Sequence, residues 1–289
     1  MPTYTALVNP ISGGGHALSI WTPIAQSLAA QGIRVTVETT RSAAHAVEAA
    51  ATAAARGDTV IAVGGDGLAR DVANGVTGTG AAMAIVPAGR GNDFARKLAL
   101  PTDPAGLTAM LATGVTRTID VIEAAGQTVL GNVYVGLDSV ANEAINNNRW
   151  LPGLLVYRLA PVSAMLRWKA PIFTLDVDGA STSARLHGVV IANSGRYGHG
   201  LDIVPSAELH DGQLDVLTIA DGPRHKIVKF MSQAKTGAHV HSDDVTVTRT
   251  TQITVAADRA VPVYADGDHL GPLPMSVTIR AAALEIVVP

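Results

Sequence analysis

One stretch in the first quarter of the chain decides the fold: Thr59-Val60-Ile61-Ala62-Val63-Gly64-Gly65-Asp66-Gly67. A short apolar run rich in valine and isoleucine is typical of a buried strand, and glycines at its end are typical of a tight turn. A helical pattern follows from Leu68 to Val76. The stretch therefore predicts a strand, a turn and a helix, the unit from which parallel sheets with helices on both faces are built.

The same unit recurs on either side of this stretch. Further strands are predicted at Thr5–Val8, Ile33–Val37 and Ala82–Val86, and further helices at His16–Ala30 and Ser42–Ala55. Strands that alternate with helices of this length predict an α/β domain with a parallel sheet. Ligands of such sheets bind beyond the carboxyl ends of the strands, where this chain places its glycine-rich loops.

The pattern changes after residue 122, where short β-branched runs are separated by Gly, Asp or Pro. The predicted strands are Thr128–Val135, Ile172–Val177, Leu186–Ala192, Gln213–Ile219, Asp244–Thr248, Gln252–Ala256, Val261–Ala265, Ser276–Ile279 and Ala283–Val288. This spacing favours an antiparallel sandwich or barrel. We expect an α/β domain at residues 1–122 and a β-rich domain at 123–279, with 280–289 returning to the first domain and Asp120 as a structural cap at the junction.

Composition excludes several classes of protein. The 289 residues include 21 Lys and Arg, 24 Asp and Glu and no Cys, which gives a net charge of −3. The weak charge argues against a nucleic-acid partner, and the lack of Cys excludes disulfides and thiolate sites. The sequence has no uninterrupted apolar run of about 18 residues and no signal-peptide pattern at its N-terminus, so we expect a cytoplasmic protein.

The Gly64–Gly67 loop has the composition of a phosphate-binding loop. Glycines let the backbone approach a ligand closely, and the amides at a helix N-terminus attract anions. The Asp66 carboxylate would repel a phosphate unless a divalent cation or an attacking hydroxyl lay between them, so Asp66 is a candidate magnesium-positioning or general-base residue. The alternative is that Asp66 only caps the helix. The chain lacks the complete dinucleotide fingerprint and the Gly-Lys of a P-loop.

Other motifs stand in a fixed order along the chain. The first half contains Asn9-Pro10-Ile11-Ser12-Gly13 and Pro87-Ala88-Gly89-Arg90-Gly91-Asn92-Asp93. The second half contains Tyr197-Gly198-His199-Gly200, Asp211-Gly212-Gln213-Leu214-Asp215-Val216 and Asp266-Gly267-Asp268. Together with Gly64–Gly67, these motifs resemble the diacylglycerol kinase catalytic family, which includes bacterial lipid kinases and sphingosine kinases and is more distantly related to NAD kinases.

The resemblance implies a role for each matching residue. The residues at its ATP-binding positions are Asn9, Pro10, Ser12, Gly13, Thr40, Gly64, Gly65, Asp66, Gly67, Leu68, Arg70, Asp71, Gly89, Arg90, Asn92 and Asp93. Asp268 stands where the family has the glutamate that takes the proton from the lipid hydroxyl, and Asp66 is the second catalytic candidate. The residues that match a magnesium site are Glu208, Asp211 and Gln213.

Several positions depart from the family pattern. Leu68 stands in place of a threonine, Arg70-Asp71 in place of Asn-Glu, and Arg90 in place of another threonine. Two hydroxyls are lost, but two guanidinium groups are gained as phosphate partners, so we interpret the loop as a rearranged phosphate site. Asp268 is one methylene shorter than the family's glutamate, which bears on how well it reaches a substrate.

Residues 144–175 contain no acidic side chain. The segment carries four basic residues and four aromatic ones: Arg149, Arg158, Arg167, Lys169, Trp150, Tyr157, Trp168 and Phe173. Basic side chains beside interfacial aromatics suit an anionic bilayer, with Trp150 and Trp168 as the candidate contacts. The alternative is that the apolar residues of this segment cover the sandwich core.

The motifs together predict an ATP- and Mg²⁺-dependent lipid kinase that phosphorylates a hydroxyl of a diacylglycerol-like or other membrane lipid. Residues 1–122 would bind the nucleotide and residues 123–279 the lipid. An NAD kinase-like enzyme and a non-catalytic nucleotide- or lipid-binding regulator stay open as alternatives. The expected partner is a lipid at a membrane surface rather than a nucleic acid. A homodimer and peripheral contact with the inner membrane surface are also left open.

Overall fold

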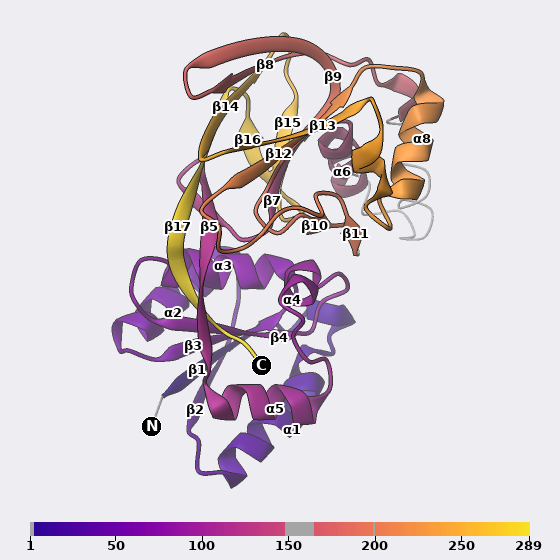
Figure 1. The fold of residues 1–289 in the computed structure, drawn as a ribbon. Helices are drawn as coiled ribbons and strands as arrows, with labels where there is room; N and C mark the ends of the chain where they lie inside the picture. The colour runs from indigo at the N-terminus through magenta and orange to yellow at the C-terminus, as the bar shows by residue number, and fades with distance from the viewer. Residues whose placement is uncertain (1–2, 148–164, 199) are drawn as a thin grey trace.

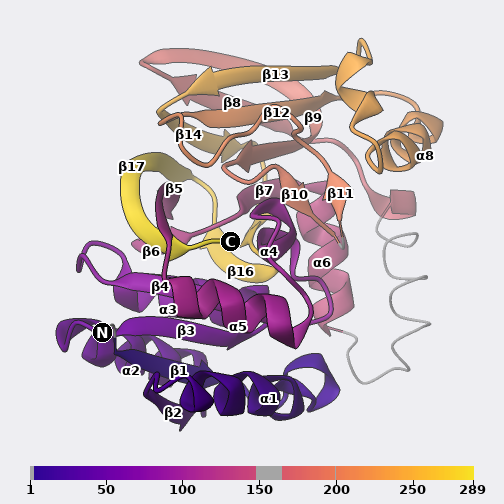
Figure 2. The ribbon, with the colours of Figure 1, turned by 60° about the horizontal axis from the view of Figure 1, so that its bottom comes forward.

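The structure, a computed structural model, describes residues 3–147, 165–198 and 200–289 and divides into an α/β half and a β-rich half (Figure 1). The parallel strands of the first half lie in the order β2-β1-β3-β4. Their bounds are β1 (Tyr4–Val8), β2 (Val35–Thr39), β3 (Thr59–Gly64) and β4 (Ala82–Pro87). Figure 2 shows this parallel sheet and the sandwich of the second half at opposite ends of the molecule.

Helices cover both faces of the parallel sheet. Helices α2 (Ala43–Ala55) and α3 (Asp66–Val76) lie on the face toward the second half, and α1 (Ala17–Ala30) and α5 (Pro104–Thr113) lie on the opposite face (Figure 1). The short elements η1 (Ser12–Gly14) and α4 (Asp93–Lys97) follow β1 and β4. This arrangement confirms the predicted α/β class.

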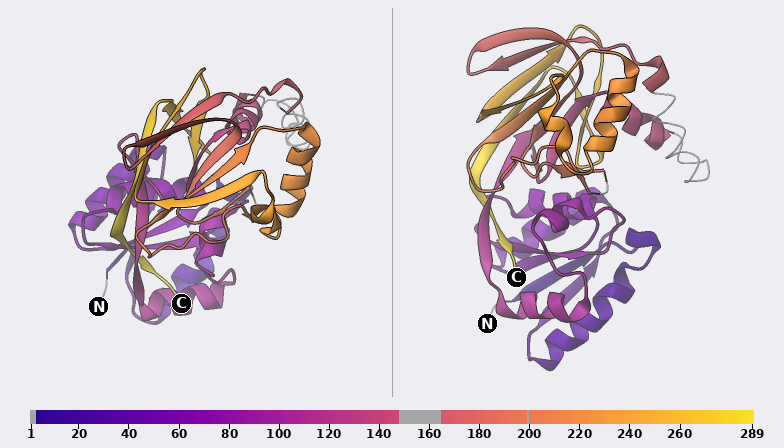
Figure 3. Two further views of the ribbon diagram at one scale, coloured as in Figure 1. Left: turned by 45° about the horizontal axis from the view of Figure 1, so that its top comes forward. Right: turned by 45° about the vertical axis from the view of Figure 1, so that its right-hand side comes forward.

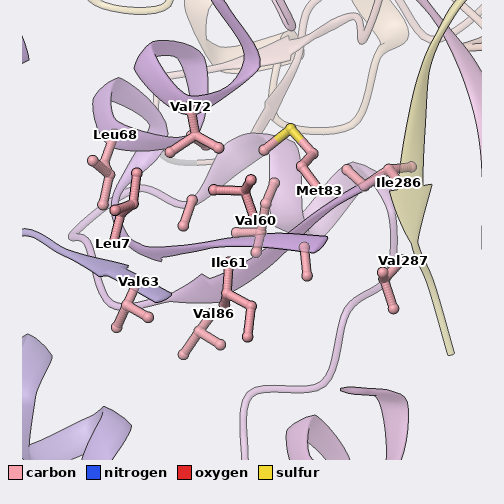
Figure 4. Packing of buried hydrophobic residues seen from close by; sticks show 14 of the residues in the cluster. Leu7, Val60, Ile61, Val63, Leu68, Val72, Met83, Val86, Ile286 and Val287 are labelled. Atoms are coloured by element: carbon pink, nitrogen blue, oxygen red, sulfur yellow. The ribbon is translucent and has the colours of Figure 1, made fainter. Parts of the chain in front are cut away.

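Burial on both sides explains why the strands β1, β3 and β4 are apolar along most of their length, whereas the edge strand β2 is largely exposed and alternates apolar with polar residues. Leu7 and Val60 point toward Leu68 of α3, whereas Ile61 and Val63 point to the other side of the sheet (Figure 4). All five side chains are buried. A strand that is covered by helices on both faces needs an apolar side chain at every position.

Two long strands, β5 (Thr116–Ala124) and β17 (Met275–Val287), run through both halves as an antiparallel pair. A bulge interrupts their register between Arg280 and Leu284, so the two strands expected at Ser276–Ile279 and Ala283–Val288 are one bent strand. The C-terminal end pairs in parallel with β4 through Glu285 and Ile286, and Figure 4 shows Ile286 beside Met83 of β4. The predicted boundary at residue 122 therefore lies inside a strand that both halves share.

Asp120 stabilises the place where β5 and β17 pass from one half to the other. Its side chain is almost fully buried, and its two carboxylate oxygens accept hydrogen bonds from the amides of Gly212 and Ala282, both at 2.7 Å. Its own amide donates to the carbonyl of Leu209 at 2.7 Å. One carboxylate thus joins β5 to the Leu209–Gly212 loop and to the bulge of β17, as the predicted structural cap should.

The second half is an antiparallel sandwich, which confirms the predicted class. Its strands are β6 (Gln127–Val129), β7 (Asn132–Gly136), β8 (Ile172–Val177), β9 (Ala180–Ala192), β12 (Leu214–Ala220), β13 (Val245–Thr250), β14 (Gln252–Ala257), β15 (Pro262–Ala265) and β16 (Asp268–Pro272), with a separate pair, β10 (Arg196–Tyr197) and β11 (Leu201–Asp202). Strand β9 pairs with β8 through its first part and with β7 and β12 through its second part, so it belongs to both layers. The side chains between the layers include Phe173, Ile253 and Val277.

The sequence pattern did not predict the helices of this half, α6 (Leu137–Asn147), α8 (Arg224–Gln233) and the single turn η2 (Ala238–His241). Helix α8 buries Ile227 and Phe230, and Phe230 packs in one cluster with Val190 and Leu217 of the sandwich. In the part of the chain that the structure describes, no helix is long and apolar enough to cross a membrane.

Candidate active site

Three glycine-rich loops meet at the carboxyl edge of the parallel sheet. A Cβ atom added to Gly89 would lie 2.4 Å from the Cα of Gly65, and one added to Gly13 would lie 2.6 Å from the carbonyl oxygen of Ala88. The loops after β1, β3 and β4 therefore touch backbone to backbone, which no side chain would permit. Gly13 also has a φ of +61°, where a residue with a Cβ is strained. The result is an edge of glycine backbone beside the N-terminus of α3.

Hydrogen bonds within the loops fix their shape. Asn92, at a φ of 53°, accepts the amide hydrogen of Gly89 at 2.9 Å and donates from its Nδ2 to the Gly89 carbonyl at 3.0 Å. Asp66 Oδ1 accepts the amide of Phe94 at 3.1 Å, which joins the start of α3 to α4. Asn9 Oδ1 accepts the amide of Ile11 at 3.2 Å. Asn9, Asp66 and Asn92 thus shape the loops in which the sequence predicts ATP contacts.

Other predicted ATP residues differ in what they offer a ligand. The Leu68 side chain is buried in the hydrophobic core of the α/β half, so only the backbone of Leu68 could contact a nucleotide. Arg90 is exposed on its loop, whereas the buried side chain of Thr40 lies at the end of β2, where its amide donates to the Val8 carbonyl at 2.9 Å. The structure therefore brings Arg90 to the surface of the glycine edge and puts Leu68 out of side-chain reach.

Arg70 connects the first half to the proposed base. Its Nη1 lies 2.8 Å from Asp268 Oδ2, and its Nη2 lies 3.0 Å from Asp71 Oδ1. The Arg70 and Asp71 side chains are largely buried, and half of the Asp268 side chain is exposed, at 50%. The sequence analysis interprets Arg70 as a phosphate partner. In the structure its guanidinium group already pairs with the carboxylates of Asp71 and Asp268, so Arg70 also orients Asp268.

One turn further along α3, Asn74 holds the second half. Its Nδ2 donates to the Thr128 carbonyl at 2.8 Å, and its Oδ1 accepts the Thr128 amide, also at 2.8 Å. An amide side chain can donate and accept at once, so Asn74 pairs with the Thr128 backbone as another strand would. Arg70 and Asn74 together fix the position of α3 against the β-rich half.

Asp266 anchors the loop that carries Asp268. Its carboxylate accepts the amides of Leu130, Gly131 and Asn132 at 3.0 to 3.1 Å. These bonds explain why the predicted strand Thr128–Val135 is divided into β6 and β7, because the amides between them turn toward the carboxylate instead of a neighbouring strand. Burial raises the pKa of Asp266 to about 6, although the amides of Gly131 and Asn132 and the Arg70 guanidinium act in the opposite direction.

A cavity of about 690 Å³ opens beside these loops and extends into the second half. At one end it is lined by the carboxylate residues Asp66, Asp93 and Asp266. Along the rest it is lined mainly by apolar side chains from α6, α8 and their neighbours, among them Leu137, Ile145, Met165, Ile227, Val228 and Met231. The cavity therefore has carboxylates beside the glycine edge and a mainly apolar lining between α6 and α8.

The middle of the cavity contains a polar network that the sequence analysis missed. Asn142 Nδ2 donates to the Tyr134 hydroxyl at 2.9 Å and to the Gly267 carbonyl at 3.1 Å, next to Asp268. The Tyr197 hydroxyl donates to Asp138 Oδ2 at 2.5 Å, and its ring stacks on that of Tyr134 with centroids 5.0 Å apart. Burial raises the pKa of Asp138, which this hydrogen bond opposes. Asp138 and Asn142 are one helical turn apart on α6, and this spacing of two polar residues is the sequence signal that could have pointed to the network.

The predicted magnesium set lies at the turn before β12. Asp211 Oδ1 accepts the amide of Gln213 at 3.0 Å, whereas the exposed Glu208 faces His210 at 3.8 Å. Asp211 Oδ2 is buried and accepts no hydrogen bond from the described residues, although Arg249 Nη1 lies 3.7 Å away. A buried carboxylate oxygen of this kind fits a hard cation, and the assignment of Glu208, Asp211 and Gln213 stays a prediction.

The expected membrane contact at Trp168 is wrong. Its side chain is buried in the sandwich core, where its Nε1 donates to His187 Nδ1 at 3.2 Å and Arg259 lies 5.0 Å from its ring centroid. Phe173 is also buried in that core. The other candidates, Arg149, Trp150, Tyr157 and Arg158, lie outside the described residues, as does His199.

Family models match nearly the whole chain in two parts. Residues 3–124 match the diacylglycerol kinase catalytic domain, and residues 131–288 match the YegS C-terminal NAD kinase beta sandwich-like domain. A diacylglycerol kinase of Mycobacterium tuberculosis is 35% identical over 99% of this chain and 94% of its own length. A probable lipid kinase YegS-like protein of Pseudomonas putida is 29% identical over 80% of this chain and 77% of its own.

Solved structures show the same fold. A crystal structure of a diacylglycerol kinase from Bacillus anthracis aligns with a TM-score of 0.76 over 99% of this chain and 97% of its own, at 18% identity. At that identity the likeness supports the architecture of both halves and their arrangement, and nothing finer.

The contact between Gly65 and Gly89 gives a first prediction. Gly89→Ala should weaken nucleotide binding at least tenfold, because the new methyl group must push the two loops apart. Isothermal titration with a non-hydrolysable ATP analogue measures this effect. Gly222→Ala is the matched control, since its Cβ would meet only Lys226 Cδ at an ordinary 3.5 Å. Equal affinities for wild type and Gly89→Ala would contradict the backbone contact.

Asp266 gives a prediction on pH. Because its pKa is about 6 in the native state against 3.8 ordinarily, the native state binds the extra proton between those values. The free energy of unfolding should therefore fall as pH rises from about 4 to about 6, by on the order of 2 to 3 kcal/mol from this group. Urea unfolding at pH 4.5 and 7 should show this loss in wild type and in the control Asp178→Asn.

The same comparison with Asp266→Asn isolates the group. The variant cannot titrate at this position, so its free energy of unfolding should lack that part of the pH dependence, whatever its absolute stability. An identical change with pH in wild type and Asp266→Asn would show that the raised pKa is wrong.

Proposed function

Because the chain belongs to the diacylglycerol kinase family and is a lipid kinase, we propose that it transfers the γ-phosphoryl group of ATP, with Mg²⁺, to a hydroxyl of a diacylglycerol-like lipid. The observation that carries this proposal is the cavity, which is lined by carboxylates beside the glycine edge and mainly by apolar side chains along the rest. A lipid alcohol has the same division, with a polar hydroxyl end and apolar chains.

The glycine edge supports ATP as the phosphoryl donor. The backbone approach of Gly65 and Gly89 leaves amides rather than side chains at the end of the sheet, next to the N-terminus of α3. Backbone amides at a helix N-terminus favour the negative charge of phosphates. Arg90 is exposed on the adjoining loop, where its guanidinium group suits a phosphate oxygen.

The carboxylates of Asp66 and Asp93 support a magnesium ion at the same end. Both line the cavity, and carboxylate oxygens are the ligands that Mg²⁺ prefers. Magnesium at a nucleotide site is usually held by one or two carboxylates together with the substrate phosphates. When bound, the ion would neutralise charge on the transferring phosphoryl group.

Asp268 is the proposed general base. It would accept the proton of the lipid hydroxyl while the hydroxyl oxygen forms its bond to the γ-phosphorus and ADP leaves. Arg70 fixes one carboxylate oxygen of Asp268 at 2.8 Å, and Asn142 holds the adjacent Gly267 carbonyl. These contacts orient a side chain that is one methylene shorter than the family's glutamate.

The apolar part of the cavity favours a lipid over the alternative substrate NAD, whose riboses and pyrophosphate are polar. The side chains of Leu137, Ile145 and Met231, which line that part, suit the hydrocarbon chains of a lipid. A non-catalytic regulator would bind lipid or nucleotide without transferring a phosphoryl group. One experiment can therefore test the NAD kinase-like and the non-catalytic alternatives together.

The proposal is tested with γ-labelled ATP, Mg²⁺ and a panel of diacylglycerol, sphingosine and NAD. We expect label in diacylglycerol, no transfer when Mg²⁺ is chelated, and a 10²- to 10⁴-fold lower kcat in Asp268→Asn and Asp66→Asn. Asp178→Asn, in the exposed turn between β8 and β9, is the matched carboxylate-to-amide control. Label in NAD alone, or lipid and nucleotide binding without transfer, would overturn the proposal.

A further inference from the structure

The outer rim of the cavity combines exposed apolar side chains with basic ones. We define the α8 rim as residues 165–169 together with residues 224–235, which include α8. Met165, Val228 and Met231 belong to this rim and also line the cavity. Figure 1 shows α8 at the outer edge of the β-rich half, and both views in Figure 3 place this orange helix at the surface, away from the indigo end of the first half.

Apolar side chains project from the α8 rim into solvent. The exposed fractions are 58% for Val228, 41% for Met231 and 57% for Leu166. Val228 and Met231 are three residues apart, so they share one face of α8, while Ile227 and Phe230 are buried against the sandwich. Large apolar side chains exposed together at the mouth of an apolar cavity indicate an interaction site rather than ordinary surface.

Basic residues surround these apolar ones. Residues 222–242 contain Arg224, Lys226, Lys229 and Lys235 and no acidic residue, in a chain whose net charge is −3. Lys226 Nζ pairs with Asp244 Oδ1 at 2.7 Å. The other two lysines of the segment, Lys229 and Lys235, are exposed and do not share that carboxylate. Lysines beside exposed apolar residues match the composition of surfaces that bind anionic bilayers.

The other part of the rim has the same character. Leu166, Arg167 and Lys169 are exposed on either side of the buried Trp168. The Trp168 indole donates to His187 Nδ1 at 3.2 Å, and His187 Nε2 contacts the Gly222 carbonyl at 3.1 Å, two residues before α8. His187 therefore links the two segments of the rim, and both segments expose apolar and basic side chains.

We propose that the α8 rim docks onto an anionic lipid bilayer, with Val228, Met231 and Leu166 in the interface and Lys229, Lys235, Arg167 and Lys169 against the headgroups. The proposal rests on the proposed function, because a lipid substrate must leave its bilayer to enter the cavity. Docking at the cavity mouth gives the lipid a path along the apolar side chains of Val228 and Met231 without passage through water.

The test measures vesicle binding in the absence of ATP and diacylglycerol, so its failure is separate from failure of the phosphoryl transfer. The full chain is co-sedimented with phosphatidylcholine vesicles and with vesicles that contain equal phosphatidylcholine and phosphatidylglycerol. We expect binding to the anionic vesicles alone and its loss in 0.5 M salt, because salt screens the attraction. No binding to anionic vesicles would overturn the proposal.

Two matched pairs of variants locate the surface. Lys229→Gln/Lys235→Gln should weaken anionic-vesicle binding by about 25-fold, and Arg34→Gln/Arg117→Gln, the same charge change on the first half, should leave it within about twofold. Val228→Ser/Met231→Ser should weaken it also, whereas the similarly exposed Val37→Ser/Val115→Ser should not. Equal losses in both members of either pair would assign binding to overall charge or hydrophobicity and contradict the rim.

A further measurement separates docking from folding and from association between copies. Lys229→Gln/Lys235→Gln should retain wild-type activity on a short-chain diacylglycerol dispersed in solution and lose activity on anionic vesicles. A loss on both substrates would contradict a docking role. Sedimentation equilibrium in which Val228→Ser/Met231→Ser converts a dimer to a monomer would show instead that the rim binds a second copy.

Discussion

Helix α3 determines the geometry of the cleft because it is part of the first half and contacts the second half through Arg70 and Asn74. Its first turn follows Gly65 at the glycine edge, its second turn carries Arg70 to Asp268, and Asn74 completes the edge of β6 through Thr128. One rigid helix thus fixes the distance between the proposed phosphate loops and the proposed base. Two of the departures from the family pattern, Arg70 and Asp268, contact each other at this point.

The sequence predicted the elements whose signals are local. The strand, turn and helix at residues 59–76 and the burial of β3 follow from an apolar run that ends at glycines. The prediction of one strand at Thr128–Val135 was wrong because the segment is divided into β6 and β7. That division depends on the Asp266 carboxylate, which is more than 130 residues away in the sequence. Helices α6 and α8 were missed because their apolar positions serve the cavity as well as the core. The roles of Tyr134 and Asn142 likewise depend on contacts that no local pattern carries.

The position of the charged side chains matters more in this protein than its net charge, which is only −3 over 289 residues. Carboxylates lie at the inner end of the cavity, and lysines and arginines lie at its outer rim. Carboxylates inside suit a metal ion and a proton acceptor, and cations outside suit the surface that supplies a lipid. Between them lie the polar network of Tyr134 and Asp138 and the apolar side chains of α6 and α8, which suit the polar end and the chains of a lipid.

The central claim is that one cleft holds a nucleotide at the glycine edge and a lipid between α6 and α8. Hydrogen–deuterium exchange with each ligand alone tests it most directly. A non-hydrolysable ATP analogue should slow exchange at residues 64–67 and 89–93, and a short-chain diacylglycerol should slow it at residues 137–147 and 224–233. Protection of the same segment by both ligands, or of the β-rich half alone by the nucleotide, would contradict the account.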